Sequence, residues 1–181
     1  MSIIVKDLDN LIIDLCDLES DFFNIMCINK IFFELISDNK LFKQYKQCRL
    51  SVKNRYFVNW NKCSITFENL LFYESCNLGL LLFSKYLVSK YIIDIRAWND
   101  YTFIWICFNG HLDTAKWLIE LSKGKKIRNK LIDIHAHIDG AFVRSCENGH
   151  FDVAKWLIEL GKQPGYTPFS DEIILKYYHP K

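Results

Sequence analysis

The sequence contains little proline, little glycine and almost no net charge. Three of its 181 residues are proline and seven are glycine, which excludes collagen-like and proline-rich low-complexity chains. A net charge of +2 argues against a strongly basic nucleic-acid-binding chain. Half of the residues are hydrophobic and 24% are charged, a composition typical of a chain that packs a core.

The charge and hydropathy pattern of the sequence also predicts no secretory signal and no membrane-spanning segment. Lys6 is the one basic residue before the acidic residues begin at Asp7, so no basic leader precedes a long apolar run. The apolar run over residues 75–84 is about half the ~20 residues that a bilayer span needs. We therefore expect a soluble, intracellular protein without a membrane partner.

Catalytic and metal-binding motifs are absent as well. The sequence has no glycine-rich phosphate loop, no Gly-x-Ser-x-Gly and no His-Glu-x-x-His, so we expect no enzyme activity and no cofactor. The pair in His135-Ala-His137 is isolated and lacks the ligand spacing of zinc modules. Seven cysteines without a Cys-x-x-Cys pair predict reduced thiols rather than a disulfide framework.

An internal repeat is the strongest positive feature. Residues 93–121 and 132–160 align without a gap at a period of 39, and 18 of the 29 aligned positions are identical. A weaker copy lies upstream when Gly79 is placed on Gly110. Such duplication indicates a structural unit. Three cysteines share one position of this unit and are predicted to fill the core as small hydrophobes: Cys76, Cys107 and Cys146.

Each unit is predicted to consist of two helices separated by a glycine. Apolar residues recur at helical spacing on both sides of Gly110, and glycine suits the position after a helix end. Asp100 and Asp139 stand where they could N-cap the first helix of each unit. The alternating residues 93–95 and 132–134 predict short extended, hairpin-like arms.

This helix–turn–helix–arm unit resembles the ankyrin repeat. Phe103 and Phe142 correspond to the Leu of the family's Thr-Pro-Leu-His element, and Gly110-His111 corresponds to its Gly-His turn. The Lys-Trp-Leu-Ile-Glu-Leu signature resembles the divergent ankyrin repeats of giant DNA viruses of the mimivirus type. The resemblance implies a short solenoid of about three repeats over residues 69–165, the first degenerate, followed by a capping helix within 166–181.

The resemblance also implies a binding surface, because the turn and first helix of ankyrin repeats line a concave, protein-binding face. The two strong repeats agree at their scaffold positions and diverge on this face. This is expected when packing fixes the scaffold residues and the bound partner determines the surface residues. Trp and Arg are enriched in interface hot spots. The predicted concave-face residues are Arg96, Trp98, Asp100, Trp105, Phe108, His135, His137, Asp139, Arg144 and Glu147.

Residues 1–45 have helical apolar spacing and resemble an F-box, most clearly at Phe22-Phe23 and at residues 28–32 and 35–39. That family contacts the Skp-type adaptor of cullin ubiquitin ligases. The open alternative is that residues 1–45 serve only as an N-terminal cap for the repeats. Residues 46–68 are predicted to be a basic connector. The adaptor contacts implied by the resemblance are Leu8, Leu11, Ile12, Leu15 and Phe22.

We therefore expect an all-α, non-catalytic protein-binding chain. It would act in the host cytoplasm, with the virion and nucleus as alternatives, either as a substrate adaptor of a cullin-type ligase or as a plain ankyrin scaffold that sequesters a host protein. A nucleic-acid or metal-binding module would need the His pair or the basic loop, and that loop lacks aromatics for base stacking. Its basic residues are Lys123, Lys125, Lys126, Arg128 and Lys130.

Overall fold

The computed structural model describes residues 39–56, 66–124 and 131–180. The chain falls into two units, residues 1–43 and residues 44–181, and most of the described residues belong to the second. They form eight helices and no strand, which confirms the all-α class for that part of the chain. Among these helices, none combines the length and the apolarity that crossing a membrane requires.

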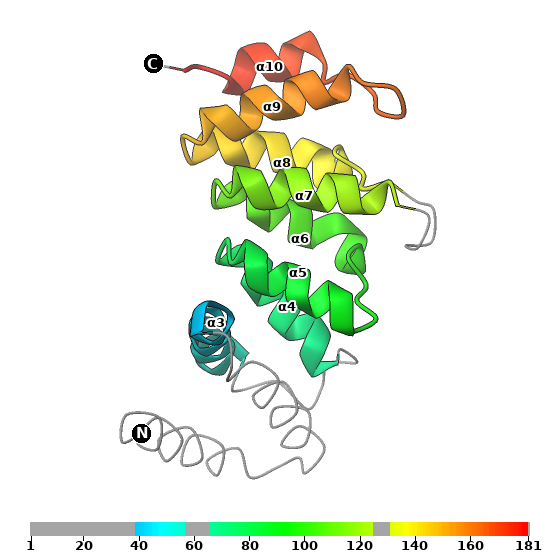
Figure 1. The fold of residues 1–181 in the computed structure, drawn as a ribbon. Helices are drawn as coiled ribbons and strands as arrows, with labels where there is room; N and C mark the ends of the chain where they lie inside the picture. The colour runs from blue at the N-terminus through cyan, green and yellow to red at the C-terminus, as the bar shows by residue number, and fades with distance from the viewer. Residues whose placement is uncertain (1–38, 57–65, 125–130, 181) are drawn as a thin grey trace, which may run out of the picture. The chain divides into compact units, whose positions relative to one another are not determined.

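Three helix pairs succeed one another along residues 66–161 (Figure 1). They are α4 (Phe67–Asn77) with α5 (Leu81–Lys90), α6 (Ala97–Phe108) with α7 (Leu112–Ser122), and α8 (Ala136–Glu147) with α9 (Phe151–Gly161). The first helices α4, α6 and α8 pack side by side in one layer, and each second helix packs on the first helix of its own pair. The sequence repeat therefore corresponds to a repeated pair of helices.

The same turn joins the two helices of every pair. Gly110 follows the end of α6 with a φ of 74°; its N–H donates to the carbonyl of Cys107 and that of His111 donates to Ile106, both at 3.1 Å. This Schellman arrangement satisfies the last carbonyls of the helix, and its positive φ suits glycine. Equivalent turns follow α4 and α8, at Gly79 and Gly149. The prediction that Gly110 ends the first helix is confirmed.

Aromatic contacts between a buried Phe and a partly exposed Trp join one helix pair to the next. Phe103 of α6 lies 6.3 Å, between ring centroids, from Trp156 of α9. One repeat earlier, Phe72 of α4 lies 6.5 Å from Trp117 of α7. Because a single helix pair cannot bury its own apolar face, these contacts make each repeat depend on its neighbour.

The repeat cysteines lie in the same core. Cys76, Cys107 and Cys146 are all buried free thiols, as their shared repeat position predicts. Burial raises the pKa of Cys76 to about 12 and that of Cys146 to about 11. The thiols are therefore protonated at neutral pH and act as small core side chains rather than nucleophiles.

The arms between the pairs are irregular in the described residues 91–96 and 131–135, which contain no strand. Side chains of the preceding first helix hold them. The N–H of Asp94 donates to the side-chain oxygen of Asn69 at 3.0 Å, and the N–H of Asp133 donates to Oδ2 of Asp100 at 3.0 Å. Asn69 and Asp100 occupy the same repeat position, so this bond recurs between consecutive pairs.

The prediction that Asp100 and Asp139 N-cap the first helices is wrong. The N-cap positions of α6 and α8 fall on Arg96 and His135, four residues earlier, and neither makes a side-chain capping bond. The Asp100 carboxylate is directed instead to the next arm.

Within helix α3 (Asn39–Tyr56), residues 44–56 belong to the same unit as the first pair and contact it. The buried ring of Tyr45 lies 5.8 Å from that of Phe83, the N–H of Phe83 donates to Gln44 at 2.9 Å, and the Cys48 thiol donates to the carbonyl of Leu71 at 3.2 Å. The predicted division between residues 1–45 and the connector 46–68 thus falls inside a helix. Residues 57–65 lie outside the described part.

The C-terminal region runs back over the last pair. Residues 162–170, the C-terminal strap, lead into α10 (Asp171–Tyr177), whose N-cap Ser170 accepts from the N–H of Ile173 at 3.3 Å. Helix α10 packs on α8, although none of its own residues is buried. It lies within the range 166–181, where a capping helix is predicted.

Candidate functional site

Three aromatic side chains form a connected group on one side of α6. Tyr101, Trp105 and Phe108 are spaced four and three residues apart, which places them on one helix face. The Trp105 ring lies 5.8 Å from Tyr101 and 4.9 Å from Phe108, both edge-to-face. Trp105 is 36% exposed although it is a large apolar residue. We call Tyr101, Trp105 and Phe108 the aromatic patch.

Polar side chains continue the surface from α6 onto α8. Arg144 and Glu147 occupy the repeat positions of Trp105 and Phe108, and both are exposed. His137 is exposed too, with its ring 5.3 Å from that of Tyr101. The predicted binding residues Trp105, Phe108, His137, Arg144 and Glu147 therefore lie on one face of two adjacent helices, the α6–α8 face.

On α4 the side chains at the equivalent positions bond to neighbouring side chains of the same protein. Glu74 takes the place of Trp105, but it is buried and hydrogen-bonded to Ser51 of α3. Asn77 takes the place of Phe108 and accepts from the side-chain amide of Asn109 at 2.7 Å. The accessible surface of the first helices is therefore concentrated on α6 and α8.

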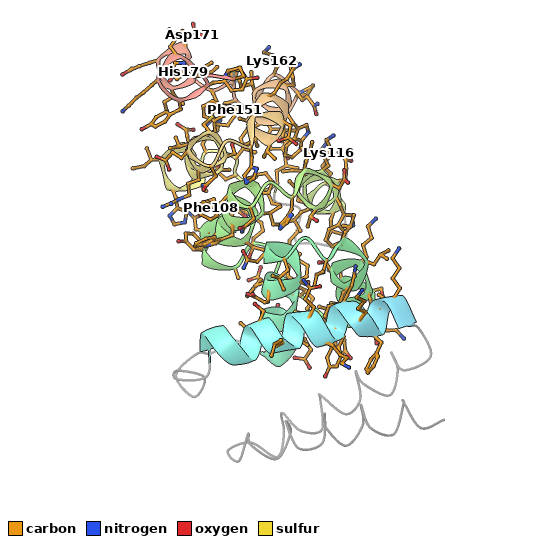
Figure 2. All side chains as sticks on the ribbon, turned by 90° about the vertical axis from the view of Figure 1, so that its left-hand side faces the viewer. Phe108, Lys116, Phe151, Lys162, Asp171 and His179 are labelled. Atoms are coloured by element: carbon orange, nitrogen blue, oxygen red, sulfur yellow. The ribbon has the colours of Figure 1, made fainter. Side chains whose placement is uncertain are left out.

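The α6–α8 face is opposite the outer side of the second helices. Figure 2 shows Phe108 on one side of the stack and Lys116 of α7 on the other. Lys116 and its repeat equivalent Lys155 are both exposed. These lysines are identical between the two strong repeats, whereas the residues of the α6–α8 face differ.

Two predicted binding residues, Arg96 and Asp100, belong to the scaffold instead. Asp100 is 0% exposed, and its carboxylate accepts from Arg96 Nε at 2.7 Å as well as from the Asp133 N–H. The hydrogen bonds that Arg96 donates to Asp100 raise the pKa of Arg96. The assignment of Asp100 to a partner-binding surface is corrected, because a buried carboxylate that already holds two groups of its own chain is not accessible to a partner.

His135 and Asp139 form the corresponding pair in the last repeat. His135 Nδ1 bonds to Oδ1 of Asp139, and Nε2 lies 2.9 Å from the carbonyl oxygen of Thr167. Both side chains are partly buried, with 29% and 16% of their surface exposed. Their contacts connect α8 to the strap, so these two residues also have a structural role.

A left-handed turn precedes the regular part of α6 and of α8. Asn99 and Asp100 have positive φ in α6, as do His137, Ile138 and Asp139 in α8. Ile138 is 89% exposed, and positive φ is unfavourable for a β-branched residue. The predicted site residue Trp98 lies beside the first of these turns, and its side chain is outside the described part.

Some predicted sites fall outside the described residues altogether. These are the implied adaptor contacts Leu8, Leu11, Ile12, Leu15 and Phe22. In the basic loop, Nζ of Lys123 lies 2.7 Å from Oε1 of Glu120. Residues 125–130 of this loop lie outside the described part. Within the described ranges, no group of three His, Cys, Asp or Glu side chains is arranged to hold a metal ion.

Tyr101 is the member of the aromatic patch that the sequence pattern did not single out. Its spacing from Trp105 and Phe108 carries the signal, since residues four and seven positions apart share a helix face.

Comparisons with protein-family models, curated proteins and solved structures find no match for this chain. The functional assignment therefore depends on the geometry of this face.

Proposed function

We propose that the chain is a non-catalytic protein-binding module of the ankyrin type and that it binds its target on the α6–α8 face, which corresponds to the concave face implied by the resemblance. The observation that carries this proposal is the aromatic patch. Trp105 stays 36% exposed in a fold that buries most of its other large apolar side chains in the described residues.

The chemistry of the α6–α8 face suits a protein partner. Aromatic and Arg side chains are enriched where binding energy concentrates in protein interfaces. The edge-to-face ring contacts of Trp105 hold the patch in place, so binding loses little side-chain entropy. Arg144 and Glu147 would form a polar rim that selects partners by charge.

The repeat geometry supports the ankyrin assignment. Three helix pairs stack in order, each with a glycine of positive φ in its turn, and side chains of one pair hold the arm of the next. Scaffold positions such as Phe103 and Cys107 are identical in the last pair, whereas Trp105 and Phe108 are replaced by Arg144 and Glu147. Such division is expected when packing constrains the scaffold and a target constrains the surface.

Affinity capture with the full-length chain tests the proposal. Trp105→Ala combined with Phe108→Ala should abolish capture of a target from host-cell lysate, while the circular-dichroism spectrum stays unchanged. Lys116→Ala combined with Lys155→Ala alters two exposed residues on the second helices and serves as the matched control. Capture that survives the aromatic substitutions and fails with the lysine substitutions would place binding on the opposite face and reject the proposal.

The F-box-like resemblance of residues 1–45 extends the proposal to a ligase link. In this version the chain joins the target on its repeats to a Skp-type adaptor and a host cullin-type ligase. Full-length protein carrying Leu11→Ala and Leu15→Ala should then lose the adaptor and keep the target. If the unaltered chain captures its target and recovers no adaptor or cullin, the alternative of a plain ankyrin scaffold that sequesters a host protein holds instead.

A further inference from the structure

His135 connects the last repeat to the C-terminal strap through both of its ring nitrogens. Nδ1 bonds to the Asp139 carboxylate, and Nε2 lies 2.9 Å from the carbonyl oxygen of Thr167 in the strap. The imidazole also lies 4.6 Å, between ring centroids, from Phe169, which is itself 4.9 Å from Phe142. One side chain thus holds a hydrogen-bonded and an apolar contact to the same segment.

The two hydrogen-bond partners of His135 determine which protonation state satisfies them. An ionised carboxylate and a backbone carbonyl are both acceptors and cannot donate. A neutral imidazole has a single N–H, whereas the imidazolium has two. Both bonds are therefore made together only by the imidazolium, and loss of one ring proton removes either the bond to Asp139 or the bond to Thr167.

The strap also contacts the repeats away from His135. Phe169 is its buried anchor, and the chain passes so close to Gly161 that a β-carbon there would lie 2.9 Å from the Thr167 carbonyl oxygen. Helix α10 follows directly and has no buried residue. The strap is thus one of the attachments that hold α10, beside its packing on α8.

The preceding repeat shows the same arrangement with a permanent charge. Arg96 occupies the repeat position of His135 and pairs with Asp100, the equivalent of Asp139. A guanidinium keeps its proton throughout the physiological range, whereas an imidazole does not. The last repeat thus has a titratable group where its neighbour has a fixed cation.

We propose that His135 is a pH-sensitive clasp, which fastens the C-terminal strap and α10 to the last repeat while its imidazole carries both ring protons and loosens them as the pH rises. The proposal concerns this end of the repeat array and does not rely on target binding by the α6–α8 face.

The electrostatic surroundings of His135 agree with that direction. Burial lowers the pKa of His135, but the hydrogen bonds to Asp139 and Thr167, together with the charges of Asp139 and Asp133, raise it above its ordinary value in sum. Among the described residues, these two carboxylates are the charged groups acting on the ring, and the strap contributes the Thr167 carbonyl and the Phe169 ring. A histidine in an unfolded chain titrates near pH ~6.5. The clasp is thus complete below about that pH and is lost as the pH rises through the higher folded pKa.

Hydrogen exchange of the full-length protein tests the clasp. The unaltered chain and His135→Gln, which keeps a donor without a titratable charge, are compared at the same pH, so that intrinsic exchange rates cancel. At pH 5.5 the peptide covering residues 162–178 should exchange on the order of tenfold faster in His135→Gln, as expected for loss of one charge-assisted hydrogen bond. At pH 8.5 the two proteins should converge, while peptides from α4 stay alike at both pH values.

Two outcomes would overturn the proposal. One is a difference between the proteins that does not change with pH. The other comes from the unaltered chain alone: an NMR titration in which the His135 ring loses its proton below pH ~6.5, the ordinary value for a histidine. The second measurement remains decisive even if His135→Gln fails to fold.

Discussion

The imidazole of His150 lies over Gly110, so closely that a β-carbon built on Gly110 would stand 2.4 Å from the ring Nδ1. His111 lies over Gly79 in the same way, at 2.6 Å. Nothing lies within 4 Å of the equivalent point at Gly149, in the last turn. In two successive joints the missing side chain of one turn therefore makes room for the histidine of the next.

Comparing Gly110 with Gly149 distinguishes two reasons for glycine in these turns. One is the positive φ, and the other is the space that a missing side chain leaves for the histidine of the next turn. Gly110 and Gly149 have nearly the same φ, 74° and 76°, so Gly149→Ala should cost only the strain of a left-handed alanine, about 1–2 kcal/mol. Gly110→Ala carries that strain and also displaces His150, so it should cost clearly more. Chemical denaturation of both variants measures the difference. Equal losses would mean that the histidine contact contributes nothing to the joint between repeats.

The buried Asp100 carboxylate gives a second prediction. Asp100→Ala leaves the Arg96 guanidinium and the Asp133 N–H without their common acceptor, so we expect about 3 kcal/mol of destabilisation. Asp113→Ala removes an exposed carboxylate of α7 and should change the free energy of unfolding by less than about 0.5 kcal/mol. Urea unfolding curves compare the two. If Asp100→Ala were as stable as Asp113→Ala, the arm would not depend on this carboxylate.

The core assignment is tested with two leucines of opposite exposure. Leu157 of α9 is 0% exposed and Leu175 of α10 is 74% exposed. Leu157→Ala should cost roughly 2–5 kcal/mol, because it leaves a cavity, whereas Leu175→Ala should have little effect. Thermal unfolding followed by circular dichroism measures both. Similar melting temperatures for Leu157→Ala and the unaltered chain would reject the packing of the last pair.

His111 should respond to pH in the direction opposite to His135. Its Nε2 lies 3.0 Å from the carbonyl oxygen of Asn77. Burial lowers the pKa of His111, the bond to Asn77 opposes that shift, and the charge of His150 adds to it, so the folded pKa is below the ordinary value.

The stability that neutral His111 contributes is thus fully present above about pH 6.5 and is lost as the pH falls through the folded pKa. His111→Gln should be less stable than the unaltered chain at pH 7.5, and this gap should narrow between pH 6.5 and pH 5. Thermal unfolding across that range measures the gap. A gap that widens on acidification would contradict the assigned neutral state.

Local signals in the sequence were sufficient for the helix pairs. The glycine after each first helix, the shared cysteine position and the repeated Phe103 and Phe142 identify turn and core correctly, because each depends on one backbone conformation or one packing position. The continuation of α3 beyond residue 45 was missed for a physical reason. The sequence of α3 is mostly polar and charged, and only a few of its residues, such as Tyr45 and Cys48, pack against the first pair. Its apolar positions are therefore too few to distinguish a helix from a polar connector.

The roles of Asp100 and His135 could not be predicted from their own repeats. Each side chain is directed to a neighbouring segment, the arm for Asp100 and the strap for His135, and such contacts leave no mark on local helical periodicity. One signal was nevertheless available. A basic residue four positions before an acid occurs in both strong repeats, at Arg96 and Asp100 and at His135 and Asp139, and this spacing suits an ion pair.

Site-specific photocrosslinking tests the central claim, binding by the α6–α8 face, most directly. A photoreactive benzoylphenylalanine is incorporated singly at Phe108, Arg144, Lys116 or Lys155 of the full-length chain, and each protein is irradiated with the captured target. We predict covalent products from positions 108 and 144 and none from positions 116 and 155. Products that form only from positions 116 and 155 would place the target on the second helices and contradict the account.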